Sequence, residues 1–190
     1  MKRVLTALLF VGLIGGARTA SATNIVLNPS FETSDFTDWS QSGNEGFTDV
    51  TGCGGHGGCY YASFGPIGSV GYISQDLATT AGDSYDLSFW LQSDGSYYNE
   101  ADAYWDGNQI FGPTVLPAQD WTEYIFSGLL ATGDTTTLTF GFQDDPSYNH
   151  LDDIDVEDNG PAAVPEPASL FLLGTGLVGV GLRQWRKARA

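Results

Sequence analysis

The chain has 190 residues, including 23 acidic and 7 basic ones, and a formal net charge of −16. All the basic residues lie in the terminal segments; between residues 23 and 160 there are 22 Asp and Glu and neither Lys nor Arg. Binding to nucleic acid needs Lys or Arg to displace counterions from the phosphates. The composition of residues 23–160, which we call the body, therefore excludes a nucleic-acid partner. An acidic surface of this kind suits solubility, divalent cations or neutral ligands, and simple solvation accounts for most of the carboxylates.

Residues 1–22 have the order of a secretory signal peptide. Lys2 and Arg3 form a positive head, residues 4–17 form an apolar run, and residues 20–22 read Ala-Ser-Ala, a small-residue cleavage site. A short buried helix is the alternative, but the basic residues at the start and the small-residue cleavage site argue against it. We therefore expect export and a mature chain that begins near residue 23.

Residues 164–190 carry three consecutive features. A proline-framed motif comes first and consists of Val164, Pro165, Glu166 and Pro167. Residues 168–182 are uncharged and apolar, and as a transmembrane helix they would reach about 22 Å, less than a typical hydrocarbon core of ~30 Å. Residues 183–190 form a basic tail, which favours the cytoplasmic side of a membrane. This order predicts a body outside the membrane and contact with the membrane through the C-terminal segment.

This arrangement resembles the PEP-CTERM sorting signal of proteins exported by Gram-negative, exopolysaccharide-producing bacteria. The resemblance implies a partner, exosortase, a membrane cysteine transpeptidase-like enzyme that cuts near the motif. It also implies export across the inner membrane, a transient anchor before processing, and a final place at the cell surface or in the extracellular matrix. Residues 159–163 are expected to form a linker between the body and this signal.

Residues 23–158 are expected to form one all-β domain. In DSYDLSFWL, side chains alternate so that Tyr85, Leu87, Phe89 and Leu91 share one face, as in a half-buried strand. TTTLTFGF repeats the pattern with Leu138, Phe140 and Phe142. Further strands are expected at residues 24–28, 60–64, 72–77, 101–105, 121–126 and 150–156. Gly-Asp and Asp-Gly pairs mark turns at residues 82–83, 94–95, 106–107 and 133–134. About eight short strands indicate a sandwich or jelly roll.

Four segments, in order, resemble galactose-binding-like and carbohydrate-binding-module-like jelly rolls. They are NIVLNPSFE followed by Trp39, then AGDSYDLSFWL, YWDGNQI and FQDDPSYNHLDDIDVED. One departure is Pro29, where glycine is usual, which alters the first turn. The resemblance spans residues 24–158 and implies a jelly-roll β-sandwich whose ligands bind on loops at one rim or on the concave face of a sheet.

The same resemblance implies a structural calcium ion where the first and last strands lie side by side. Glu32 of SFE and Asp153 of LDD would supply carboxylate oxygens, with backbone carbonyls from residues 44–49, because calcium prefers six to eight hard oxygen ligands. The alternative is a pair of solvated or capped acids at a strand end.

The two cysteines lie close together in TGCGGHGGCYY. In an exported chain, Cys53 and Cys59 are expected to form a disulfide, and the four glycines between them permit a tight loop. A metal site that adds His56 is the alternative, but two thiolates and one imidazole fall short of a closed tetrahedral zinc site.

Exposed aromatic residues are the candidate ligand contacts, because sugars stack their apolar C–H faces on rings while their hydroxyls bond to acids and amides. The candidates are Trp90, Tyr97, Tyr98, Asn99, Tyr104, Tyr148 and Asn149. Most aromatic residues belong to the core, and there we expect Phe31, Trp39, Trp105 and Trp121.

Catalytic motifs are missing from the body: it has no G-x-S-x-G, no H-E-x-x-H and no phosphate loop, and neither histidine belongs to a recognisable triad. Carboxylates are so many that a glycosidase-like pair would occur by chance. We therefore expect a noncatalytic, exported surface or matrix protein that binds glycan, such as the extracellular polysaccharide of the producing cell. The alternative is a purely structural biofilm protein without a ligand pocket, and a glycoside hydrolase is a third, weaker interpretation.

Overall fold

Strand β5 (Asp83–Ser93) shows how the body forms half-buried sheets. Its odd-numbered side chains from Tyr85 to Leu91 are buried, whereas the even-numbered ones are only half-buried. Alternate residues of a strand point to opposite faces, so one face of β5 packs inward and the other is left toward solvent. The alternation predicted from DSYDLSFWL is confirmed.

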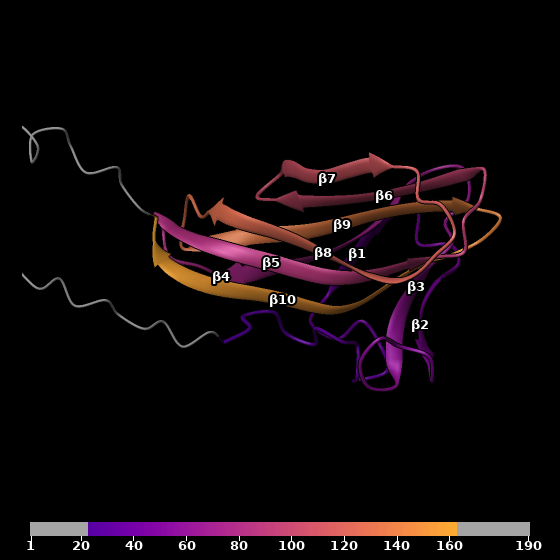
Figure 1. Cartoon of the computed structure of the whole chain (residues 1–190), viewed down its shortest axis with the longest axis horizontal. Coiled ribbons are helices and arrows are strands. Elements are labelled where there is room, and N and C mark those ends of the chain that lie inside the picture. The colour runs from indigo at the N-terminus through magenta and orange to yellow at the C-terminus, as the bar shows by residue number, and fades with distance from the viewer. Residues whose placement is uncertain (1–22, 163–190) are drawn as a thin grey trace, which may run out of the picture.

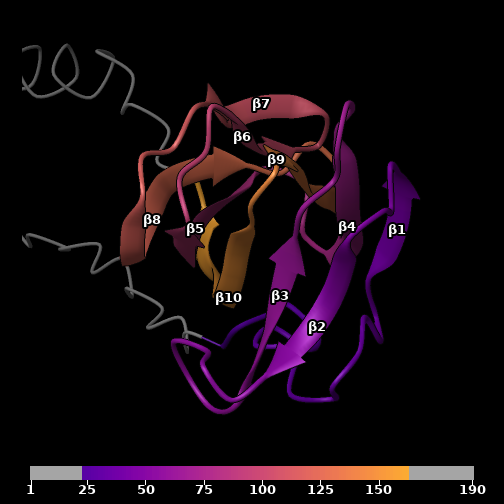
Figure 2. The same ribbon diagram turned by 90° about the vertical axis from the view of Figure 1, so that its right-hand side faces the viewer.

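The computed structural model describes residues 23–162, which form a sandwich of two five-stranded antiparallel sheets (Figure 1). The first sheet has the order β1 (Ser40–Gly43), β4 (Gly71–Ala78), β9 (Thr135–Asp145), β6 (Tyr98–Trp105) and β7 (Asn108–Thr114). The second has the order β2 (Thr48–Gly52), β3 (Tyr60–Phe64), β10 (Asn149–Pro161), β5 and β8 (Gln119–Leu130). Figure 2 shows the two layers end-on.

The predicted signal peptide and the sorting segment, including the expected membrane segment 168–182, lie outside the described residues. Residues 23–162 contain no helix that is long and apolar enough to cross a membrane.

Aromatic and aliphatic side chains fill the space between the sheets. Phe64 of β3 stacks on Phe142 of β9 with ring centroids 4.3 Å apart, and Phe89 of β5 meets Phe140 of β9 edge to face at 5.0 Å. Such aromatic pairs add to the stability gained from burial alone. Three of the four expected core aromatics are buried, namely Phe31, Trp39 and Trp105. The fourth, Trp121, is not.

The N-terminal segment differs from its expected strand. Residues 24–28 do not form a strand, and the chain bends at residues 27 and 28; instead Ile25 donates a backbone hydrogen bond to Val156 of β10. The Asn24 side chain adds two more bonds, donating to the Ile154 carbonyl at 2.8 Å and accepting from the Val156 amide at 3.1 Å. Side-chain and backbone bonds together therefore hold the start of the body against its last strand.

Strand β10 is longer than expected and contains a bulge. Its pairing with β5 shifts between Asp152 and Asp155, and Asp153 adopts a φ of 45°. A bulge of this kind re-aims neighbouring side chains. At the far end Pro161 still pairs with Asp83, so the strand occupies most of the segment expected as a linker from residue 159 onward.

Candidate functional site

Outward side chains of four neighbouring strands, β4, β9, β6 and β7, form a continuous surface, the first-sheet face. We define it by Tyr72, Glu100, Asp102, Tyr104, Gln109, Thr139 and Gly141. Directly opposed residues in antiparallel strands point to the same side of a sheet. Tyr72 of β4 lies opposite Gly141 of β9, which lies opposite Asp102 of β6. Tyr104 lies opposite Thr139. Two tyrosines therefore flank a strip of small residues on β9.

Gly141 leaves room on this face for the ring of Tyr72. A Cβ atom at this position would lie 2.7 Å from Cε1 of Tyr72 and 3.3 Å from Cγ1 of Val70. The Tyr72 ring thus lies against the glycine backbone, and any side chain on β9 here would displace it.

Asp102 is the most buried polar group of the face, with 3% of its surface exposed. Gln109 Nε2 donates a hydrogen bond to its Oδ1 at 2.8 Å and lies 3.5 Å from the Tyr104 hydroxyl. Burial, and next the negative charge of Glu100, raise the pKa of Asp102 to about 6. Burial and the charge of Asp102 also raise the pKa of Tyr104, which therefore remains a protonated hydrogen-bond donor.

A hollow of about 290 Å³ adjoins this face at the start of β6. It is lined by Tyr97, Tyr98, Asn99, Glu100, Pro113, Thr114, Val115 and Gln143. Glu100 belongs both to the hollow and to the first-sheet face, so the two are continuous. The exposed fractions of Tyr97 and Tyr98 are 92% and 64%, which leaves both rings free to contact a ligand.

Two of the predicted ligand residues lie inside the protein. Asn99 Nδ2 donates hydrogen bonds to Ser93 Oγ at 2.7 Å and to the Leu116 carbonyl at 3.0 Å. Asn149 Nδ2 donates to Asn99 Oδ1 at 3.1 Å. Because both amides are buried and engaged, we correct the prediction: they hold the loops at this end of the sandwich, and their side chains are not available as ligand contacts.

Two others lie on the opposite sheet, away from Tyr104. Trp90 points outward from β5, and the imidazole of His56 stacks on it with centroids 3.5 Å apart. Tyr148 stacks on His150 at 6.2 Å and is 37% exposed. The structure therefore divides the predicted aromatic set between the two outer faces of the sandwich.

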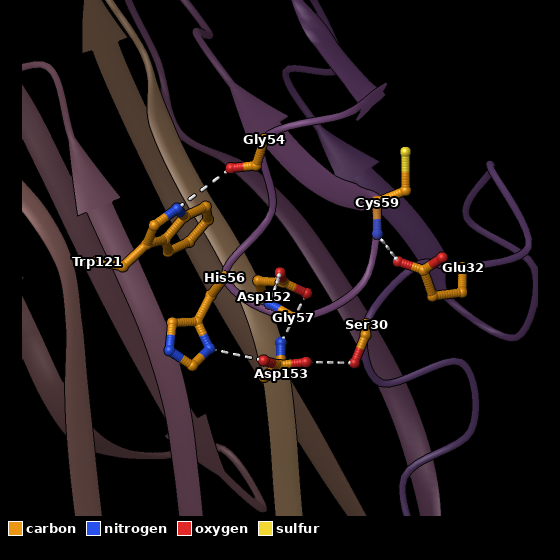
Figure 3. Close-up of polar contacts among 9 residues, drawn as sticks. All are labelled: Ser30, Glu32, Gly54, His56, Gly57, Cys59, Trp121, Asp152 and Asp153. Atoms are coloured by element: carbon orange, nitrogen blue, oxygen red, sulfur yellow. Dashed lines mark hydrogen bonds and ion pairs between the residues drawn. The ribbon is translucent and has the colours of Figure 1, made fainter.

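The predicted calcium residues do come together, at the corner where the glycine-rich loop 53–59 meets β10 (Figure 3). Glu32 Oε1 accepts backbone hydrogen bonds from Cys59 at 2.7 Å and Tyr60 at 2.9 Å. Asp153 accepts a bond from the Ser30 hydroxyl at 2.6 Å and pairs with Nδ1 of His56 at 2.7 Å.

The glycines of this loop allow the close approach. A Cβ atom on Gly57 would overlap the carboxylate of Asp153, and one on Gly58 would overlap that of Glu32. The loop at residues 44–49, which was expected to supply carbonyls, instead bonds to residues 65–70. The carbonyl-rich segment nearest these two acids is therefore the glycine loop.

The corner's carboxylates are hard oxygen donors, as calcium requires, but here they accept N–H and O–H hydrogen bonds. Among residues 23–162, no group of three or more His, Cys, Asp or Glu is arranged to hold a metal ion. The donor chemistry thus fits calcium, while the geometry is that of a hydrogen-bonded corner, and calcium at Glu32 and Asp153 stays a prediction.

The cysteine pair closes the same loop. The sulfur atoms of Cys53 and Cys59 lie 2.7 Å apart as free thiols, and the Cys53 amide donates to the Cys59 carbonyl at 2.5 Å. The hydrogen bond to Cys59 and the charge of that thiol raise the pKa of Cys53. The two residues are close enough to react with each other, and the disulfide stays a prediction.

Ser30, Asp153 and His56 form a hydrogen-bonded series, but in an order that does not suit nucleophilic catalysis. The carboxylate stands between the hydroxyl and the imidazole, so the serine proton faces Asp153. A serine hydrolase needs the histidine between the other two, as the base that takes the serine proton. This corner therefore serves to join the glycine loop to β10.

Sequence reasoning missed Tyr72, Glu100, Asp102 and Gln109 of the first-sheet face. For Tyr72 a sign existed, because the strand expected at residues 72–77 places it on the side opposite the buried Ile73. The register between β6 and β7 brings Asp102 and Gln109 together. This register contains two irregularities that could not be predicted from the sequence.

The fold of this chain is similar to those of several solved structures. The structure of TmCBM61 in complex with β-1,4-galactotriose is similar with a TM-score of 0.61 and 20% identity, over 70% of this chain and 97% of that one. The CBM22-1 xylan-binding domain from Paenibacillus barcinonensis Xyn10C gives 0.57 and 17%, over 76% and 99%. The K3 cleaved adhesin domain of Lys-gingipain from Porphyromonas gingivalis gives 0.53 and 16%, over 73% and 99%. At these identities the similarity shows a shared fold.

Sequence families give a further result. Residues 23–147 match the family described as carbohydrate binding domain, and residues 163–187 match the PEP-CTERM protein-sorting motif. A comparison with curated proteins gives no match. The chain therefore belongs to the carbohydrate binding domain family through most of its β-sandwich, and it carries a PEP-CTERM sorting motif that implies an exported protein processed by exosortase.

Proposed function

We propose that the first-sheet face and its adjoining hollow bind a polysaccharide without cleaving it. The observation that carries this proposal is the pair of outward-facing tyrosines on one sheet, Tyr72, whose ring lies against Gly141, and Tyr104, which lies opposite Thr139. Rings on the outer face of a sheet, with small residues beside them on β9, suit an extended, flat ligand such as a sugar chain.

Hydrogen bonding on this face suits sugar hydroxyls. Glu100 supplies carboxylate oxygens, and Gln109 and Gln143 supply amides that both donate and accept. The phenol of Tyr104 is a further donor. Polar groups of this kind, few in number and set among apolar surface, fix the orientation of a bound ligand.

Charge restricts the class of polysaccharide. The first-sheet face carries carboxylates, and the sequence from residue 23 to residue 160 contains no Lys or Arg to neutralise an anionic sugar. Polymers rich in uronic acid or sulfate would be repelled by this face. The proposal is therefore a neutral glycan, and β-1,4-galactan and xylan are suitable first ligands because related folds are described with them.

The proposed biological role follows from joining this site to the sorting motif. After export and exosortase processing, the protein would reside at the cell surface or in the extracellular matrix and bind the producing cell's own exopolysaccharide. The strand order of the two sheets supports a jelly-roll sandwich as the scaffold.

The test is binding of the full-length chain, in detergent, to a panel of neutral and anionic polysaccharides that includes β-1,4-galactan, xylan and a polyuronate. We expect binding to at least one neutral polymer and none to the polyuronate. Tyr104→Ala should weaken the Kd about tenfold, because loss of a stacking ring costs on the order of 1–2 kcal/mol.

The matched control is Phe47→Ala, which removes an exposed ring outside the first-sheet face and should leave the Kd unchanged. If the whole panel gave no binding, the proposal would fail and a structural matrix protein without a pocket would be the better description. Release of reducing ends that is lost in Glu100→Gln would instead indicate a hydrolase.

A further inference from the structure

A band of rings lies on the outer face of the second sheet, on the opposite side of the sandwich from the first-sheet face. We call it the ring band and define it by His56, Tyr61, Trp90, Trp121, Tyr148 and His150. Neighbouring centroids are close throughout: Tyr61 lies 5.7 Å from Trp121 and 5.1 Å from His150, and Trp121 lies 6.4 Å from His56. Trp121, expected in the core, is half-exposed here.

The glycine loop 53–59 borders the band and fixes part of it. Trp121 Nε1 donates to the Gly54 carbonyl at 3.3 Å, and Asp153 holds His56 (Figure 3). The imidazole of His56 covers one face of Trp90. Trp90 is thus occupied within the protein. Of the other rings, Tyr148 is exposed and Tyr61 and Trp121 are partly exposed, so these three retain surface for a partner.

An acidic hollow of about 180 Å³ lies next to the band on the same face. Its lining residues are Asp86, Leu87, Ser88, Glu123, Ile125, Asp155 and Glu157. Glu123 connects the two features, because it lies directly opposite Trp90 and two residues along β8 from Trp121. Rings and carboxylates therefore form one surface across β5, β8 and β10.

A ligand for this surface has to satisfy both parts of it. Open aromatic rings offer faces for sugar C–H groups and, through their quadrupoles, for cations. Four carboxylates around one hollow, with no Lys or Arg anywhere in residues 23–160, attract positive charge and repel anionic polymers. A chain of amino sugars with protonated amines meets both demands, since each unit carries a C–H face and an ammonium group.

We propose that the outer face of the second sheet is a second carbohydrate site, which binds a polysaccharide with free amines through Trp121 and Tyr61 at the ring band and Glu123 at the acidic hollow. The inference takes its general ligand class, carbohydrate, from the proposed function and adds a separate surface to it. A molecule with sites on both outer faces joins two polysaccharide chains.

The test measures binding of the full-length chain, in detergent, to glucosamine oligosaccharides and to their N-acetylated counterparts, at about 150 mM salt so that long-range attraction is largely screened. We expect at least about tenfold weaker binding of the acetylated form, which lacks the ammonium group that the rings and carboxylates attract. Trp121→Ala and Glu123→Gln should each weaken glucosamine binding about fivefold or more.

Two control variants distinguish binding at this surface from general charge attraction and from binding on the first-sheet face. Glu45→Gln removes the same charge as Glu123→Gln but from an exposed residue away from the hollow, and it should leave binding unchanged. Tyr104→Ala, on the opposite face, should weaken neutral-glycan binding while glucosamine binding persists. If Trp121→Ala proves unfolded by circular dichroism, Tyr148→Ala removes a loop ring of the same band.

Equal losses in Glu45→Gln and Glu123→Gln would show general electrostatic attraction and overturn the inference. Binding that does not distinguish amine from acetamide, or that is unaffected by both Trp121→Ala and Tyr148→Ala, would also overturn it. Loss of glucosamine binding in Tyr104→Ala would place all carbohydrate on the first-sheet face; the proposed function would then stand and the second site would fail.

Discussion

Asp102 is a buried carboxylate on strand β6. Its burial makes the free energy of unfolding depend on pH. Its pKa is raised from an ordinary value of 3.8 to about 6 in the folded chain. Between these values the folded state holds more protons at this site than the unfolded state does. Its contribution to the free energy of unfolding therefore decreases as pH rises from about 4 to about 6.

Asp102→Asn removes this titration while retaining an oxygen that can accept the bond from Gln109. We expect the variant to lose less stability than the native chain between about pH 4 and about pH 6. Urea unfolding at several pH values measures the difference, and comparison with the native chain cancels the contribution of the other acids. Parallel stability curves for the two proteins would contradict the assigned pKa.

At the scale of elements, the hairpin that joins β6 to β7 depends on a two-residue turn. Trp105 pairs with Asn108, and both residues between them have positive φ, 50° at Asp106 and 73° at Gly107. This is the conformation of a type I′ turn, whose twist matches that of the flanking strands.

Gly107→Ala is expected to lower the free energy of unfolding by about 1 kcal/mol, because an L-residue adopts this φ with strain. No heavy atom lies within 4 Å of the new Cβ, so the cost comes from the backbone alone. Gly133→Ala is the matched control: its Cβ would meet only an ordinary contact at 3.5 Å and its φ lies outside the strained range. Equal stability of the two variants in urea unfolding would contradict the turn assignment.

Elements with a strong alternation could be predicted from the sequence, and those without it could not. β5 and the segment TTTLTFGF of β9 alternate apolar and polar or small residues, so their buried faces were identified. β1 is exposed at all four positions, so no hydrophobic pattern marks it. β7 contains Gly112 and Pro113, which read as a turn rather than a strand.

The site residues, like the strands, could be predicted only in part from the sequence. Tyr104 was predicted as an exposed ring, but its partners depend on which strands pair with β6. Trp121 was assigned to the core because large aromatics are usually buried; the sequence does not show that the loop 53–59 folds back and gives the indole a carbonyl partner at Gly54.

At the scale of the whole molecule, Asp153 connects the last strand to the first segment of the body through Ser30, and Glu32 connects that segment to Cys59 and Tyr60. If the two carboxylates hold calcium, the ion binds the folded state and not the unfolded one, and it should raise the melting temperature. We expect millimolar calcium to raise the Tm of the native chain by several degrees and EDTA to reverse the shift, with Glu32→Gln showing neither effect. Differential scanning calorimetry provides the measurement. A Tm that is unchanged by calcium and EDTA would leave the hydrogen-bonded corner as the complete description.

The long last strand, β10, runs from one end of the sandwich to the other. β10 starts at Asn149, whose side chain bonds to Asn99 at the start of β6, and runs thirteen residues to Pro161, where it pairs with the opposite end of β5 (Figure 1). At about 3.3 Å per residue this separates its two ends by roughly 40 Å. The sorting motif begins just past Pro161. The hollow beside Tyr97 and Tyr98 therefore lies at the end of the sandwich opposite to the one from which the chain continues into the sorting motif.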